Sequence, residues 1–344
     1  MPLISEQASV ARIMYQVLAA LLPAVAACVW YYGPAVLAQV ALASAAALGS
    51  EALMLRLRRV PVAPFLGDGS ALVTAWLIAL SFPPLAPWWL TVSATAFAIV
   101  FAKQLYGGLG NNPFNPAMVA YAVAIISFPL QMTHWSAPAG LAQAPLGFAD
   151  QLRHIFGGGL PAGLTLDAVT LATPLDTLKT QLHLGQTVDQ ALQLPVFGNV
   201  GGVGGEVVAL AYLAGGLYLW QQRIITWHIP VAFLGAIALL AGALHAADAA
   251  RHATPWLHLA GGASMIGAFF ILTDPVSSPS TPRGKLIYAG GAGALTYVIR
   301  VFGGYPDGVA FATLLMNAAA PLIELYTQDP VFGARRAADR ERRP

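Results

Sequence analysis

The chain has 344 residues, of which 57% are apolar and only 9% are charged. A soluble globular domain carries about a quarter charged residues, so this chain cannot cover its surface with polar groups, and lipid must serve as part of its solvent. The formal net charge of +2 predicts neither an acidic partner nor nucleic acid binding. The composition excludes an ordinary soluble enzyme and predicts an integral membrane protein.

The single cysteine, Cys28, lies in an apolar run. One cysteine forms no internal disulfide, and alone it holds neither an iron–sulfur cluster nor a structural zinc. A buried apolar role is therefore expected for it. The histidines show no H-x-x-x-H spacing and the chain has no C-x-x-C, so no metal site is predicted.

Apolar stretches long enough to cross a bilayer, about 20 residues each, follow one another along the chain. We expect ten spans, at residues 13–32, 35–55, 67–83, 87–106, 114–130, 203–221, 228–246, 255–273, 284–300 and 306–326. The third, fifth and eighth are short or interrupted by glycine and proline. The first is too long for the apolar region of a signal peptide, so we expect a retained helix.

The distribution of positive charge predicts the orientation, because cytoplasmic loops are enriched in lysine and arginine. With the N-terminus inside, 13 of the 17 Lys and Arg residues are cytoplasmic and 4 are outside. An even number of spans returns the basic tail, residues 328–344, to the cytoplasm. The one long polar stretch, 131–202, then lies outside, in the periplasm of a Gram-negative cell. The predicted location is a bacterial inner membrane.

Two stretches of 15 residues resemble each other. Gly69 to Pro83 and Gly261 to Pro275 both run from glycine through small and apolar residues to Leu-Ser/Thr-x-Pro. A weaker echo joins Asn115-Pro116-Ala117 to residues 317–321. Because each half holds five spans, an odd number, two such halves must be inverted in the membrane. The expected fold is all-α and polytopic, with inverted five-helix repeats at 1–130 and 203–327, although Gly- and Ala-rich membrane helices often look alike.

The outer stretch contains the run D-A-V-T-L-A-T, from Asp167 to Thr173. It resembles D-x-x-[ST]-x-A-T, the signature at which an extracytoplasmic flavin transferase esterifies FMN phosphate to the last threonine. That signature occurs in the B subunits of sodium-translocating NADH:quinone reductases and in the D subunits of Rnf complexes. A phosphate ester needs a hydroxyl on a segment that a modifying enzyme can enter. An ordinary loop threonine is the alternative.

Further motifs along nearly the whole chain resemble those of Rnf D subunits. They are GGLGNNPFNPAM (107–118), GNVGGVGGE (198–206), TDPVSSPSTPRGK (273–285) and FGGYPDGVAFATLLMNAAAPLIE (302–324). The resemblance implies covalent FMN on Thr173, with Asp167, Thr170 and Ala172 completing the signature, and a second, noncovalent riboflavin. It also implies Rnf-type partner subunits A, B, C, E and G. Leu171 departs from the family, which commonly has glycine there.

Two glycine-rich turns are further candidates for flavin contacts. Gly204, Gly205 and Glu206 begin the sixth expected span, where free backbone N–H groups suit a phosphate; a tight turn is the alternative. At the inner face, Lys103 and Asn115 flank a glycine-rich stretch that could line the second flavin pocket. The alternative for Lys103 is an anchor that reaches the lipid headgroups.

Several acidic residues lie near the ends of expected spans, where most would cap helices or form interfacial pairs. They are Asp68, Glu206, Asp274, Asp307 and Glu324. Asp274, in T-D-P at an expected helix break, is the best candidate for a role near an ion path or a flavin.

Two functions remain open. The first is a flavin-carrying membrane subunit of an oxidoreductase that couples electron transfer, of the ferredoxin or NADH type, to ion translocation. The chain would act only with partners, because it has no cluster ligands and no nucleotide-binding domain. The second is a small-solute channel or transporter, suggested by the N-P-A triplet and the inverted repeats. That alternative leaves the flavinylation motif unexplained.

Overall fold

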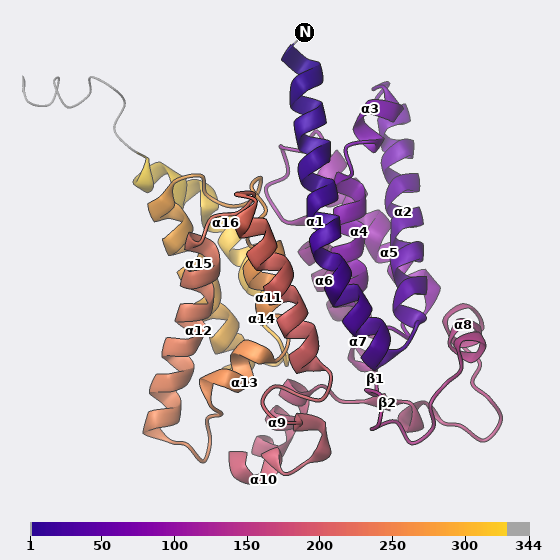
Figure 1. The fold of residues 1–344 in the computed structure, drawn as a ribbon, viewed down its shortest axis with the longest axis vertical. Helices are drawn as coiled ribbons and strands as arrows, with labels where there is room; N and C mark the ends of the chain where they lie inside the picture. The colour runs from indigo at the N-terminus through magenta and orange to yellow at the C-terminus, as the bar shows by residue number, and fades with distance from the viewer. Residues whose placement is uncertain (1, 329–344) are drawn as a thin grey trace, which may run out of the picture.

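The computed structural model describes residues 2–328, and for residues 2–9 it describes the backbone only. Apart from Gln328, the predicted basic tail lies outside the described residues. The described chain is mostly helical, with one two-stranded ladder (Figure 1). A polytopic membrane protein was expected, and the helical architecture agrees with it.

The first part of the chain, shown in indigo and purple in Figure 1, forms one group of helices. They are α1 (Pro2–Tyr32), α2 (Ala35–Leu57), α3 (Val62–Leu66), α4 (Ser70–Ser81), α5 (Trp88–Phe97), which continues as the π-helical η1 (Ala98–Gln104), α6 (Pro116–Ser127) and α7 (Pro129–Thr133). α2 packs against α4 and α5.

The last part of the chain forms a second group, drawn from red to yellow. It comprises α11 (Gly205–Gln221), α12 (His228–Ala247), α13 (Pro255–Ala260), α14 (Ser264–Ile266), the π-helical η4 (Gly267–Ile271), α15 (Pro282–Phe302) and α16 (Val309–Thr327). α12 packs along α15, and α15 packs along α16.

Between the two groups the chain forms short elements at one end of the molecule. They are β1 (Trp135–Ser136), α8 (Phe148–Gly157), η2 (Leu166–Ala168), β2 (Thr170–Leu171), α9 (Pro174–His183), α10 (Val188–Leu192) and η3 (Pro195–Phe197). In Figure 1 these elements lie at the lower end, whereas the start of α1 and the end of α16 both lie at the upper end.

In the described part of the chain, four helices are long and apolar enough to cross a membrane: Val10–Tyr32 of α1, α2, α12 and α16. α4 and α6 are apolar but have 12 residues each, or about 18 Å, which is less than the ~30 Å hydrocarbon core. The eighth expected span is broken at Gly261–Ala263, between α13 and α14. The expectation of short or interrupted third, fifth and eighth segments is confirmed.

Glycines allow the closest approaches between helices. A Cβ on Gly215 of α11 would lie 2.1 Å from the carbonyl oxygen of Ala20, so only glycine fits between α11 and α1. A Cβ on Gly293 of α15 would lie 2.4 Å from the carbonyl oxygen of Phe233 in α12. Small residues of this kind are typical where membrane helices pack tightly. The α1–α11 contact joins the two groups of helices.

Candidate functional site

A large cavity lies where the two groups of helices meet the short outer elements. It encloses about 1450 Å³ of non-atom space, counting its open side. Its wall comes from the end of α1, the end of α4, α6, the strands, the starts of α9, α11 and α16, and the α13–α14 break.

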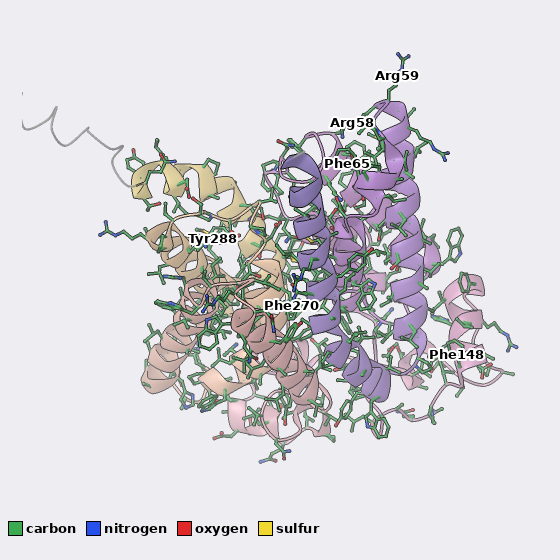
Figure 2. All side chains as sticks on the ribbon, turned by 45° about the horizontal axis from the view of Figure 1, so that its top comes forward. Arg58, Arg59, Phe65, Phe148, Phe270 and Tyr288 are labelled. Carbon is green, nitrogen blue, oxygen red and sulfur yellow. The ribbon has the colours of Figure 1, made fainter. Side chains whose placement is uncertain are left out.

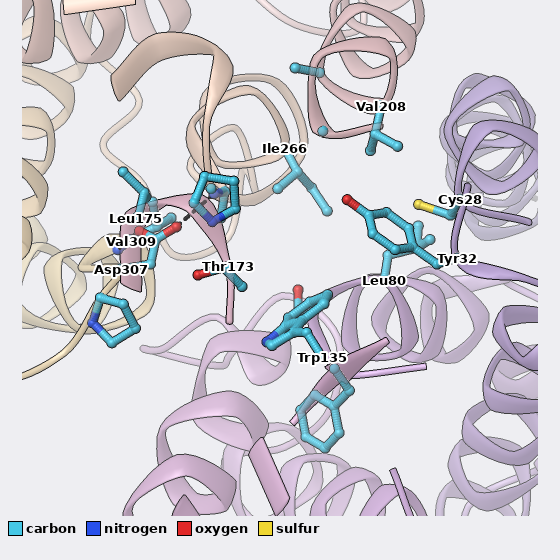
Figure 3. Close-up of a pocket in the computed structure, with 18 of the residues that line it drawn as sticks. Cys28, Tyr32, Leu80, Trp135, Thr173, Leu175, Val208, Ile266, Asp307 and Val309 are labelled. Carbon is cyan, nitrogen blue, oxygen red and sulfur yellow. Dashed lines mark hydrogen bonds between the residues drawn. The ribbon is translucent and has the colours of Figure 1, made fainter. Parts of the chain in front are cut away.

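The wall of this cavity is mainly apolar and aromatic. Its aromatic side chains are Tyr32, Phe82, Tyr121, Trp135 and Tyr212. Among the described residues that line it, Asp307 alone carries a charge. Figure 3 shows Thr173 between Asp307 on one side and Trp135 and Tyr32 on the other. The predicted flavin acceptor thus lies on the wall of this cavity.

Thr173 lies between strand β2 and helix α9, which begins at the next residue. The strand that precedes it, β2, pairs antiparallel with β1, so that Leu171 lies opposite Trp135. Thr173 itself caps α9, whose Asp176 amide donates to its Oγ1 at 3.4 Å. Threonine is a favoured N-cap residue because its oxygen accepts from an unpaired amide of the first turn. Thr173 as a residue is partly exposed, which an acceptor for a modifying enzyme requires.

The other signature residues form the turn that leads to Thr173. Asp167 is exposed in η2, and the Thr170 hydroxyl donates to the Leu166 carbonyl at 2.9 Å. Ala172 is exposed and lines the cavity. Leu171, where glycine is common, lies in strand β2 and has no positive φ. Leucine therefore fits the backbone here without strain.

Helix α9 is tied to the second group of helices. The Lys179 ammonium donates to the carbonyls of Gly303 and Tyr305, at 2.7 Å each, just beyond the C-terminus of α15. Cations are favoured at such helix ends. Leu175 and Leu178 of α9 pack in one apolar cluster with Leu257. Thr173 is therefore held from both sides, by the strand pair before it and by α9 after it.

Partial burial changes the proton affinity of both charged groups of α9. Desolvation lowers the pKa of Lys179, and the nearby Asp176 carboxylate partly offsets this. Desolvation raises the pKa of Asp176, and Lys179 in turn opposes that shift. The two groups partly compensate each other beside the acceptor residue.

We expect Lys179→Met to loosen α9 while keeping its apolar stem packed. Hydrogen bonds to charged groups contribute about 1.5–3 kcal/mol each, so amides of residues 175–183 should exchange about ten- to a hundredfold faster. Hydrogen–deuterium exchange measures this directly. Thr180→Ala, at an exposed position of the same helix, is the matched control and should leave exchange unchanged. Equal exchange in Lys179→Met and the control would show that the Lys179 contacts do not hold α9.

In the glycine-rich turn before α11, backbone amides are already bonded to a side chain of α11 itself. The Glu206 carboxylate accepts from the amides of Asn199 and Gly201, at 3.0 Å each, and also from that of Val200. Gly204 has a positive φ, and a Cβ there would contact Tyr31. Of the three residues predicted here, only Gly205 lines the cavity. The geometry is that of a tight, self-capped turn, and a phosphate role for Gly204, Gly205 and Glu206 stays a prediction.

Asp307, beside the cavity, bonds to groups from three parts of the second group of helices. Its carboxylate accepts from the Arg300 guanidinium at 3.1–3.2 Å, from the Ala263 amide at 2.6 Å and from the Val309 amide at 3.1 Å. Arg300 is also bonded to the carbonyl of His258 at 2.7 Å. Asp307 therefore joins the end of α15, the α13–α14 break and the start of α16. The sequence suggested a cap or a pair for it, but not Arg300 as the partner.

The inner candidates lie apart from Thr173 and line no part of its cavity. Lys103, in η1, forms an ion pair with Glu51 at 2.7 Å and donates to Ser70 Oγ at 2.7 Å. Lys103 and Glu51 are each 2% exposed. The amino group does not reach the surface, so the headgroup-anchor alternative for Lys103 is wrong. Sequence analysis missed Glu51, although an ionisable residue inside an expected span was the available signal.

Asn115 and Asp274 each stabilise a helix break. The Asn115 side chain caps α6 by accepting from the Ala117 and Met118 amides, and the backbone amide of Asn115 donates to Asn317 Oδ1 at 3.0 Å. The Asp274 carboxylate accepts from the Val276 amide at 3.1 Å and from Ser277 Oγ at 3.0 Å. The Asn115–Asn317 bond links the two groups of helices. A flavin or ion contact for either residue stays a prediction.

Known proteins resemble this chain over its length. A family model described as the NQR2, RnfD, RnfE family matches residues 1–333. A protein of Escherichia fergusonii, named as the D subunit of an ion-translocating oxidoreductase complex, is 50% identical over 345 residues, which cover 97% of each chain. Proteins of the same name from Salmonella typhi and Salmonella paratyphi A are 50% and 51% identical over 343 residues, again with 97% of each chain covered.

Proposed function

Because the chain belongs to the NQR2, RnfD, RnfE family, we propose that it is the flavin-carrying membrane subunit of an ion-translocating oxidoreductase complex. The family membership that the sequence motifs indicated is confirmed. Its relatives are named as D subunits of such a complex, so the chain acts within an assembly that couples electron transport to ion movement. The proposal adds covalent FMN on Thr173.

The position of Thr173 is the observation that carries the proposal. This partly exposed residue lies on the wall of a cavity lined by tyrosine, tryptophan and phenylalanine side chains. Aromatic faces suit an isoalloxazine ring, and the apolar wall excludes water. A bound flavin would supply the electron chemistry, while the chain supplies position and surroundings. β1–β2 and α9 hold the acceptor oxygen at the wall, and Arg300 neutralises the Asp307 carboxylate there.

The chain needs partners for the complete reaction. With one cysteine in 344 residues, it cannot hold an iron–sulfur cluster by thiolates alone. Oxidation of ferredoxin or NADH would therefore take place on other Rnf-type subunits, A, B, C, E and G. A noncovalent riboflavin in the membrane body, near Lys103, Asn115 and Asp274, belongs to the same proposal. An extracytoplasmic flavin transferase would attach the FMN.

Ten spans in two inverted halves are part of the proposal, and two correspondences support them. Ser81 donates to the Leu77 carbonyl at 2.7 Å, and Thr273 donates to the Phe269 carbonyl at 2.8 Å, at matching positions of the 15-residue motif. In each half a buried cation late in the fourth segment bonds to the third segment. These contacts join Lys103 to Ser70 and Arg300 to His258.

The arrangement of the ends supports the proposed orientation. Figure 2 shows Arg58 and Arg59 at one end of α2 and Phe148 near the opposite end. The arginine end is the one at which α1 begins and α16 ends (Figure 1). Positive charge is expected on the cytoplasmic side. We therefore assign that end to the cytoplasm and α8, α9 and α10 to the periplasmic side of an inner membrane.

Fluorescence of the denatured chain tests the proposal. A covalent flavin survives SDS, so the band from cells with an extracytoplasmic flavin transferase should fluoresce under ultraviolet light. The same chain from cells that lack the transferase is the control and should be dark. A dark band from the transferase-containing cells would rule out the covalent flavin and favour a subunit without one.

A further inference from the structure

We propose that α8 is an interfacial helix that lies in the headgroup region of the outer leaflet and presents Phe148 and Phe156 to lipid. The proposal rests on the membrane placement of the chain and not on the flavin. Its partner is a lipid surface.

The two sides of α8 differ in chemistry. Phe148, Leu152 and Phe156 are spaced four residues apart and therefore share one side of the helix. Phe148 and Phe156 are 50% and 54% exposed. Asp150 and Arg153 lie on the opposite side, where they form an exposed pair at 3.3 Å. The helix thus has an apolar side whose two phenylalanines are about half exposed and a polar side that suits water.

A third strip of α8 docks on α2. The Gln151 side chain accepts from the Ala35 amide at 2.8 Å, which caps the start of α2, and donates to the Leu146 carbonyl at 3.0 Å. Gly33, in the turn between α1 and α2, lies so close that a Cβ there would be 2.8 Å from Gln151 Nε2. α8 is therefore fixed to the outer end of two helices that are long and apolar enough to span.

The depth of α8 follows from its apolar contacts. Ile155 is 1% exposed and belongs to a cluster with Ala35, against which Ala38 and Leu42 of α2 also pack. Leu42 lies two turns into α2, or about 10 Å from its start. Interfacial helices lie about 5–10 Å into the boundary between headgroups and acyl chains. α8 thus lies beside the first turns of α2 and not beyond them.

The neighbouring surface favours lipid as the occupant. In Figure 1 α8 lies at the outer edge of the first group of helices, beyond α2 and away from α9 and α10. Leu37 of α2 and Trp30 of α1, near the same end of the molecule, are 48% and 78% exposed. Exposed apolar side chains of both spanning helices therefore lie near the end of the molecule that carries α8. Asp150 and Arg153 cancel each other's charge, so lipid of either charge is accommodated.

Spin-label accessibility tests the placement. The full chain is reconstituted in phosphatidylethanolamine–phosphatidylglycerol nanodiscs, with a nitroxide attached in Phe148→Cys, Phe156→Cys or Leu152→Cys. The last variant keeps both phenylalanines, so a signal from it does not depend on losing an anchor. Arg153→Cys is the matched control on the polar side of the same helix. Cys28 is buried, and the wild-type chain treated with the reagent gives its background.

The expected result is a ratio of oxygen to nickel-chelate accessibility that is several-fold higher at 148, 152 and 156 than at 153, because oxygen partitions into lipid. High nickel accessibility at all four positions would overturn the proposal and place the helix in water. Low accessibility to both reagents at 148, 152 and 156 would also overturn it, since a protein surface would then cover this side.

Discussion

Thr173→Val should abolish covalent flavin entirely while the chain still folds and inserts. Valine has nearly the shape of threonine but no hydroxyl, so no phosphate ester can form. The substitution also removes the acceptor for the Asp176 amide, and loss of an N-cap costs about 1 kcal/mol. In-gel fluorescence of the denatured band measures the flavin, and chromatographic behaviour in detergent measures folding. A fluorescent Thr173→Val band would show that the flavin is attached elsewhere.

Two control variants separate chemistry from helix capping. Thr173→Asn keeps an oxygen that can cap α9 but offers no hydroxyl for esterification, so it should also be dark. Thr170→Val removes a hydroxyl three residues earlier, whose bond goes to the Leu166 carbonyl. Because Thr170 is part of the signature at which the transferase acts, that variant should lower the fluorescence, but it should not abolish it, since the Thr173 hydroxyl remains. Fluorescence in Thr173→Asn together with a dark Thr170→Val band would move the acceptor to Thr170.

Glu51→Gln should destabilise the protein by about 3–5 kcal/mol, because it leaves the buried Lys103 ammonium without its counter-charge. Lys103 and Glu51 are both 2% exposed and 2.7 Å apart. The same Glu51 oxygen also accepts from Gln104 Nε2 at 2.8 Å, so the neutral amide would disturb two contacts. Thermal unfolding in detergent, followed by loss of the monodisperse peak, measures the effect.

The exposed pair of α8 is the matched control. Arg153 and Asp150 lie 3.3 Å apart, with side chains 65% and 34% exposed, so Asp150→Asn should change stability by at most about 1 kcal/mol. The double variant Glu51→Leu with Lys103→Met should be near neutral, because it removes both charges together. A double variant as unstable as Glu51→Gln would mean that the pair contributes more than charge balance to the fold.

The sequence predicted the helical segments well because their signal is local. Length and hydropathy alone place helices near all ten expected ranges, and the Gly-Gly pair at 261–262 marks the α13–α14 break. The π-helical turns η1 and η4 were not predicted. They depend on how the chain packs around them, and composition does not encode that.

Contacts between residues that are far apart in the chain could not be predicted from the sequence. Thr173 was identified from its signature, but the cavity around it draws on segments from Cys28 to Ala310. The partners of Lys103 and Asp307 also come from elsewhere: Glu51 is 52 residues away, and Asp307 bonds an amide 44 residues away. Only the folded chain brings such groups together, so one sequence cannot indicate them.

Residues 172–174, around Thr173, connect two elements that are attached to different groups of helices. Strand β2 is paired to β1, which follows α7 of the first group of helices, and Val169 packs with Ala35 of α2. Beyond Thr173, Lys179 fastens α9 to the end of α15 in the second group. A change in spacing between the two groups would act on these few residues as well as on the α1–α11 contact. A cofactor carried there would move, relative to one wall of its cavity, whenever the halves of the protein shift.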